Sequence, residues 1–169
     1  MENREGYKKT ELGWIPESWE VKQLDNLKSD EENSFIDGDW IETPYITSSG
    51  IRLIQTSNIG IGKFIDKNKK YISEISFKEL KCKEVKNQDI LICRLAEPIG
   101  RSCIVPNLST KNITAVDVTI FRPNTFMVCR NYINYYLNSE KALNVVKKLS
   151  GGSTRQRINR TNLAKTKLP

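Results

Sequence analysis

The sequence contains no histidine, and this absence excludes several kinds of chemistry. Without imidazole there is no histidine general base, no histidine metal ligand and no Ser/His or Cys/His nucleophile pair. The four cysteines show no C-x-x-C spacing, which removes the usual zinc sites as well. We therefore expect no bound metal, and reduced, buried thiols at Cys82, Cys93, Cys103 and Cys129.

Glycine-rich cofactor loops are also missing. A Walker loop ending at Gly62-Lys63 would need glycine in place of Ser57 and Ser or Thr in place of Phe64. The dinucleotide fingerprint fails because Ile65 stands where glycine or alanine is needed. Nuclease-like Glu-x-Lys tripeptides occur three times, as expected by chance in a chain rich in both residues. The sequence thus predicts a protein that has no cofactor and is not itself an enzyme.

No apolar run approaches the roughly 20 residues that a membrane span needs. The first residues, MENREGYKKTELGW, lack the apolar centre of a signal peptide, so we expect a cytoplasmic protein. A length of 169 residues suits one domain of ordinary size. We expect a single domain over residues 1–169, with a polar lead-in at 1–18 and a basic C-terminal segment at 150–169.

Acidic residues are absent from Lys141 to the end of the chain, where eight Lys and Arg occur. Residues 1–140 hold nineteen Lys and Arg against twenty Asp and Glu, so the whole net charge of +7 arises in the tail. A localised basic segment beside a nearly neutral body is typical of a surface that binds a polyanion, because each cation that neutralises a phosphate releases a counterion. A solvated surface is the alternative interpretation of the charge alone.

Amide and hydroxyl side chains separate the tail arginines and can hydrogen-bond phosphates or base edges, while arginine can bind guanine through two donors. Gly151 and Gly152 would let the backbone approach a phosphate closely. The candidate DNA contacts in the tail are Ser153, Thr154, Arg155, Gln156, Arg157, Asn159, Arg160 and Lys165.

Four further candidates lie in the body of the chain: Arg52, Gln55, Arg94 and Arg101. Each could instead pair with a carboxylate such as Glu97 or Asp117, because arginines in β-structure are often structural. The three tryptophans are expected in the core or as residues that fasten segments to the body, and only exposure would make them base-stacking platforms: Trp14, Trp19 and Trp40.

The hydrophobic pattern predicts an α+β fold rich in strands, with a few helices. We expect a strand and then a turn or short helix at 19–27, a surface loop at 29–39, and strands at 51–54, 59–65, 89–95, 101–105, 113–116 and 118–121. Helices are expected at 73–81, with a capping box formed by Ser76 and Glu79, at 130–138, and from a cap at Ser139 to Leu149.

Five segments carry a more specific signal: YKKTELGWIPESWEVKQL, GIRLIQTSNIG, DILICRLAEPIGRSCIVP, ITAVDVTIFRP and SGGSTRQRINRTNLAKTKLP. In this order they resemble the specificity subunits of type I restriction-modification systems. The resemblance implies one target-recognition domain, a mixed sheet or partial barrel with flanking helices, that reads one half of a split sequence in double-stranded DNA. It also implies partners, namely the modification (methyltransferase) subunits and, through them, the restriction subunit. The chain departs from the family pattern by stopping at Lys167-Leu168-Pro169, where a helical spacer generally follows.

A second class of function stays open from the sequence. The basic tail could dock an acidic protein, which would make the chain a protein-interaction module.

Overall fold

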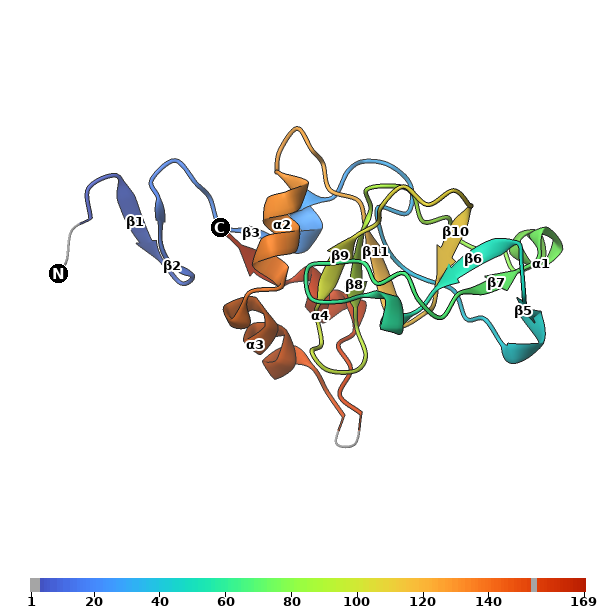
Figure 1. Ribbon diagram of the computed structural model, residues 1–169. Coiled ribbons are helices and arrows are strands. Elements are labelled where there is room, and N and C mark those ends of the chain that lie inside the picture. Colours follow the sequence, from blue (N-terminus) through green and yellow to red (C-terminus); the bar gives the residue numbers. More distant parts are fainter. Residues whose placement is uncertain (1–3, 153–154) are drawn as a thin grey trace.

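The computed structural model describes residues 4–152 and 155–169. At its centre lies a four-stranded antiparallel sheet (Figure 1). The order of its strands is β4 (Phe35–Asp37), β11 (Val118–Phe121), β8 (Ile90–Cys93) and β9 (Ser102–Ile104). Every residue of β8 and β11 is buried, so these two strands form the middle of the protein.

Alternation along β8 explains why both faces of the central sheet are covered. Ile90 and Ile92 pack in one hydrophobic cluster with residues of the helices, whereas Leu91 and Cys93 pack in a second cluster on the opposite face. A strand buried on both faces needs a continuous apolar run, which is the pattern of residues 89–95. The strand predicted there is confirmed.

A second four-stranded sheet adjoins the central one and has the order β10 (Asn112–Thr114), β6 (Ile51–Ile54), β7 (Lys70–Ile72) and β5 (Ile46–Thr47). β10 and β6 are parallel, and the other pairs are antiparallel. The predicted short helix forms as α1 (Glu74–Glu79). Its cap is Ser73, whose hydroxyl accepts a hydrogen bond from the Ser76 N–H at 3.0 Å, so the capping box expected at Ser76 was placed three residues too late.

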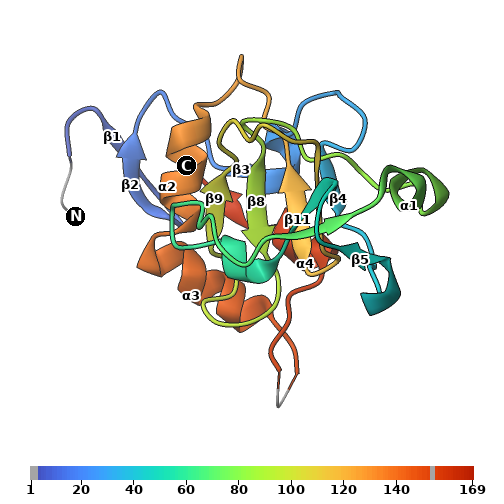
Figure 2. The same cartoon turned by 45° about the vertical axis from the view of Figure 1, so that its right-hand side comes forward.

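Two further helices, α2 (Arg130–Leu137) and α3 (Glu140–Leu149), lie beside β9, as Figure 2 shows. Amide side chains of α2 fasten it to the strand, since Asn134 accepts a hydrogen bond from the Ser102 hydroxyl at 2.9 Å and Asn138 accepts one from the Ser102 N–H at 3.0 Å. The Ser139 hydroxyl accepts from the Ala142 N–H and begins α3, as the sequence predicted.

The C-terminal end of the chain pairs with the segment that follows the lead-in, in a small two-stranded sheet. β12 (Lys167–Leu168) pairs with β3 (Lys22–Gln23), which is followed by a 3-10 helix at Leu24–Leu27. The lead-in forms a hairpin of β1 (Tyr7–Thr10) and β2 (Gly13–Pro16) that lies at the edge of the molecule (Figure 1). Its turn is held by the C-terminal part of the chain, because Lys141 donates to the Leu12 carbonyl and Lys167 pairs with Glu11 at 2.7 Å.

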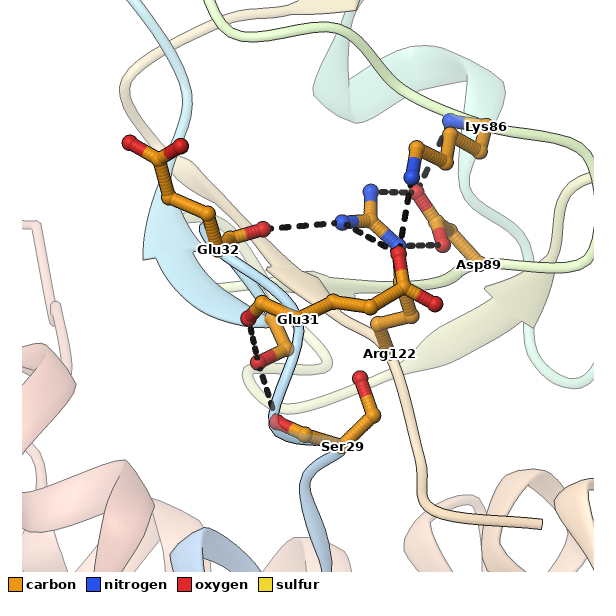
Figure 3. Close-up of polar contacts among 7 residues, drawn as sticks. Ser29, Glu31, Glu32, Lys86, Asp89 and Arg122 are labelled. Carbon is orange, nitrogen blue, oxygen red and sulfur yellow. Dashed lines mark hydrogen bonds and ion pairs between the residues drawn. The ribbon is translucent and has the colours of Figure 1, made fainter.

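A buried ion pair joins the central sheet to the acidic segment before β4 (Figure 3). The Nε and Nη2 of Arg122 donate to the two carboxylate oxygens of Asp89, both at 2.7 Å, and its Nη1 donates to the Glu32 carbonyl at 3.2 Å. Asp89 also accepts from the Lys86 N–H at 2.8 Å. The hydrogen bonds that Arg122 donates to Asp89 raise the pKa of the Arg122 guanidinium. The pair connects the start of β8, the end of β11 and residues 31–34.

Two further predictions of local structure were wrong. Residues 29–39 are not a surface loop throughout, because Phe35–Asp37 form β4, which pairs with β11 at the edge of the central sheet. Residues 59–65 do not form a full strand, since a single bridge joins Ile59 to Phe64 around the Gly60–Gly62 turn. Among the cysteines, Cys129 is exposed, and the other three are buried as expected.

We predict that Arg122→Ala lowers the free energy of unfolding by about 3–5 kcal/mol, because the substitution leaves the Asp89 carboxylate buried without its partner. Urea denaturation followed by circular dichroism measures the change. The matched control is Lys28→Ala, which breaks an exposed pair with Asp25 and is expected to cost less than about 1 kcal/mol. Equal urea midpoints for Arg122→Ala and the wild type would show that the pair is not a structural anchor.

Candidate nucleic-acid interface

At the start of the basic tail, the segments on either side of residues 153–154 run side by side and extend away from the body (Figure 1). The backbone N–H of Gly151 donates to the Arg157 carbonyl at 3.0 Å, and the Arg157 N–H donates to the Gly151 carbonyl at 2.9 Å. Gly152 has φ +104, and a Cβ there would stand 2.5 Å from the Arg155 carbonyl, so the turn requires glycine. We call residues 151–157 the tail loop.

The second half of the tail loop presents polar side chains to solvent. Arg155 and Gln156 are both exposed, and Arg155 has no hydrogen bond or ion pair with any residue that the structure describes. The predicted contacts Ser153 and Thr154 lie outside the described residues. Arg155 and Gln156 are therefore the candidates whose donors and acceptors are available to a base or a phosphate.

Two other tail arginines contact carboxylates of the body. Arg157 Nη2 lies 2.9 Å from Asp117, which precedes β11, and Arg160 Nη1 lies 3.9 Å from Asp37 at the end of β4. Both arginines are nearly half exposed. The carboxylates thus hold Arg157, the last residue of the tail loop, and Arg160, which follows the loop, while part of each guanidinium stays accessible.

The last two tail candidates lie at opposite ends of α4 (Arg160–Ala164). Asn159 is exposed and caps the helix, because its side-chain oxygen accepts from the Asn162 N–H at 2.7 Å. Lys165 follows the helix and lines a cavity with Glu11 and Val145, near the lead-in hairpin. The structure therefore brings Asn159 close to the tail loop and places Lys165 at the far end of the helix.

Arg94, at the end of β8, is buried beneath the tail loop. Its Nη1 donates to the Ile158 carbonyl at 3.3 Å, its Nη2 donates to the Val116 carbonyl at 2.5 Å, and Nη2 lies 3.1 Å from Asp37. Burial, opposed by the Asp37 charge, lowers the pKa of the guanidinium, which still stays charged at any physiological pH. This arginine joins the ends of two strands to the tail.

The remaining three candidates of the body belong to other segments, one in β6, one directly after β6 and one directly before β9. Arg101 is buried and donates to backbone carbonyls of Ile59, Thr56, Ala96 and Pro98 at 2.7–3.2 Å. Arg52 is buried, its Nη1 pairs with Asp66 at 2.6 Å, and its guanidinium lies over the Phe64 ring. Its Nε and Nη2 have no hydrogen-bond partner among the described residues. Gln55 is half-buried, and its N–H donates to Asn58. Their carboxylate and carbonyl partners differ from the Glu97 and Asp117 that the sequence suggested.

Sequence reasoning missed the role of Asp37 and the exposure of Trp40. Asp37, assigned to a surface loop, is the carboxylate shared by Arg94 and Arg160. Trp40, expected in the core or as a fastening residue, is 72% exposed, three residues beyond Asp37. Trp19 is 41% exposed and contacts the Tyr132 ring edge-on at 5.2 Å. No sequence pattern indicates the ion pairs of Asp37 or the exposure of Trp40, because both depend on the three-dimensional structure.

Within residues 4–152 and 155–169, no group of three or more Cys, Asp and Glu side chains is arranged to hold a metal ion. None of the helices in this described part is long and apolar enough to cross a membrane.

The chain is similar in sequence and in fold to proteins that are already known. The chain is 28% identical over 171 residues to a Methanocaldococcus jannaschii protein described as a type I restriction enzyme MjaX specificity subunit. The alignment covers 98% of this chain and 38% of that protein. The chain resembles type I specificity subunits. No protein-family model matches it.

Three solved structures show that the resemblance extends to the fold of these subunits. A chain from a study of complex assembly and conformational transition of a type I R-M system aligns with a TM-score of 0.63, 16% identity, and coverage of 91% of this chain and 34% of that one. The type I S subunit of M. genitalium aligns with a TM-score of 0.57 and 12% identity, and the alignment covers 89% of this chain and 33% of that one. The HsdS subunit of Thermoanaerobacter tengcongensis aligns with a TM-score of 0.55 and 13% identity, and the alignment covers 94% of this chain and 38% of that one. The α+β, target-recognition-domain-like fold predicted from the sequence is confirmed. The chain spans only about a third of the length of each of these proteins.

The contrast between Arg101 and Arg155 yields a prediction for this specificity-subunit fold. Arg101→Ala is expected to lower the free energy of unfolding by at least about 3 kcal/mol, because several buried carbonyls lose a charged donor. Arg155→Ala is expected to change the free energy of unfolding by no more than about 0.5 kcal/mol, because the side chain is exposed and has no partner among the described residues. Chemical denaturation of both variants measures the difference. A similar loss in both would contradict the separation of a structural arginine from an accessible one.

Proposed function

We propose that this chain recognises double-stranded DNA in a sequence-specific manner and reads one half of a bipartite target for a type I restriction-modification complex. The similarity to specificity subunits along 98% of the chain supports this role. So does the concentration of positive charge in the tail, which is the pattern of a phosphate-binding surface.

The single observation that carries the proposal is the tail loop itself. Two backbone hydrogen bonds join Gly151 and Arg157 at its base. Arg155 and Gln156 are exposed, and their side chains have no hydrogen-bond partner among the residues that the structure describes. Arginine and glutamine are side chains that form paired hydrogen bonds with guanine and adenine in the major groove. A loop held at its base can insert such side chains with little loss of conformational freedom.

In this proposal the chain does no chemistry. Modification subunits would supply methylation, the restriction subunit would supply cleavage through them, and the complex would act in the cytoplasm. The single-domain organisation over residues 1–169 is part of the same proposal. The rival function, docking of an acidic protein through the basic tail, predicts binding that depends on charge but ignores base sequence.

We predict that duplexes selected from a random library at low salt share a short motif, and that Arg155→Ala weakens binding to the best duplex by about 1–3 kcal/mol while relaxing the preference at one base pair. The reason is the loss of paired hydrogen bonds to one base. Fluorescence anisotropy of selected and scrambled duplexes measures both effects. A plot of the logarithm of the association constant against the logarithm of the salt concentration should have a negative slope of about 0.9 for each phosphate contact.

Two control variants separate base reading from charge. Arg155→Lys keeps the positive charge but lacks the planar pair of N–H donors that arginine presents. The variant should therefore keep the salt dependence of binding and lose the preference for one base pair. Lys148→Ala, which removes an exposed cation without a partner in the described part of the chain, should weaken all duplexes by a similar factor. Selection that enriches no motif, together with equal binding of duplex DNA and an acidic polypeptide, would favour the rival function.

A further inference from the structure

An open cavity of about 350 Å³ lies at the base of the tail loop. Its walls come from the end of β8, the residues after α3 and the start of α4, and they include Arg94, Ser150, Gly151, Arg157, Asn159 and Asn162. No acidic side chain belongs to its lining. We call it the loop-base cavity.

Positive charge is in excess around this cavity. Arg94, Arg157 and Arg160 share two carboxylates, those of Asp37 and Asp117, which leaves one positive charge without a counter-charge in the cluster. One of the three, Arg94, is buried, so its charge is screened little by water. An anion in the cavity would balance the cluster.

A free hydrogen-bond donor accompanies this charge. The Nε–H of Arg94 is buried and has no partner among the residues that the structure describes, although both Nη atoms of the same side chain are bonded. Buried polar groups in proteins nearly always have a partner, supplied by protein, water or ligand. Arg157 also lines the cavity, and its guanidinium is nearly half exposed. Two guanidinium groups therefore border one open cavity.

We propose that the loop-base cavity binds a phosphate group through Arg94 and Arg157, and that in the DNA complex this group belongs to the DNA backbone. The second clause rests on the proposed function above. Arginine binds phosphate oxygens with charge-assisted and often paired hydrogen bonds. A phosphate fixed here would set the position of the duplex relative to the tail loop, since backbone contacts determine register while base contacts determine sequence.

Gly151 offers a matched pair of test variants. It lines the cavity, its φ is not in the left-handed region, and a Cβ added to it would meet nothing within 4 Å. Gly151→Asp places a negative charge at the cavity wall without a steric clash, and Gly151→Asn places a neutral side chain of nearly the same shape there. Both variants keep Arg94 and its hydrogen bonds to the Ile158 and Val116 carbonyls, so they differ from each other only in the charge at the cavity wall.

The first measurement is a titration with inorganic phosphate at constant ionic strength, followed by NMR of the ¹⁵N-labelled arginine Nε–H groups. Phosphate is expected to shift the Arg94 resonance saturably in the wild type and in Gly151→Asn, and to leave it unshifted in Gly151→Asp. The Arg101 resonance, whose Nε–H is bonded to the Ile59 carbonyl, is the internal control and should not move.

The second measurement replaces phosphate with a short DNA duplex at low salt, and then with the same duplex carrying a neutral methylphosphonate backbone. The ordinary duplex should shift the Arg94 resonance and prevent the phosphate shift, whereas the neutral duplex should do neither. If phosphate shifts Arg94 but no duplex binds, the cavity is a site for free phosphate and the proposed DNA function fails. If duplex DNA binds and neither ligand shifts Arg94, the cavity proposal is overturned while the proposed function stands.

Discussion

The polar groups gathered around Arg94 decide where the tail lies relative to the central sheet. A buried guanidinium needs partners for its donors, and here they come from Asp37 at the end of β4, the Val116 carbonyl before β11 and the Ile158 carbonyl in the tail. The Ile158 N–H completes the junction by donating to the Arg94 carbonyl at 3.1 Å. The tail is therefore fastened to the ends of buried strands, and the tail loop projects from a rigid base.

Because the tail is fastened in this way, the net charge of the chain overstates the number of cations that are available to bind a polyanion. Of the eight cations after residue 140, five contact a carboxylate or a carbonyl of this chain, so they serve partly to hold the tail, the helices and the lead-in hairpin together. The other three, Lys148, Arg155 and Lys165, have no such partner among the described residues. Local pairing, and not the total charge of +7, determines which cations a polyanion can reach.

The sequence predicted the elements that depend on local pattern. The apolar run of β8 and the serine cap of α3 are signals that a few neighbouring residues define, and both were confirmed. β4 was missed because its three residues follow a polar stretch and gain their stability from pairing with β11, a distant segment. The roles of the arginines depend on partners far away in the sequence, 64 residues for the Arg94 contact with Ile158 and 90 residues for the Arg122 contact with Glu32. No local pattern reports such contacts.

The central claim is that the tail loop touches DNA bases, and site-specific photocrosslinking tests it most directly. A photoreactive phenylalanine derivative replaces Gln156, at the exposed side of the tail loop, or Phe126, which is fully exposed in the loop before α2 on the opposite side of the molecule (Figures 1 and 2). Our account predicts crosslinks to duplex DNA from position 156 and none above background from position 126. Equal yields from both positions, or crosslinks from position 126 alone, would contradict it.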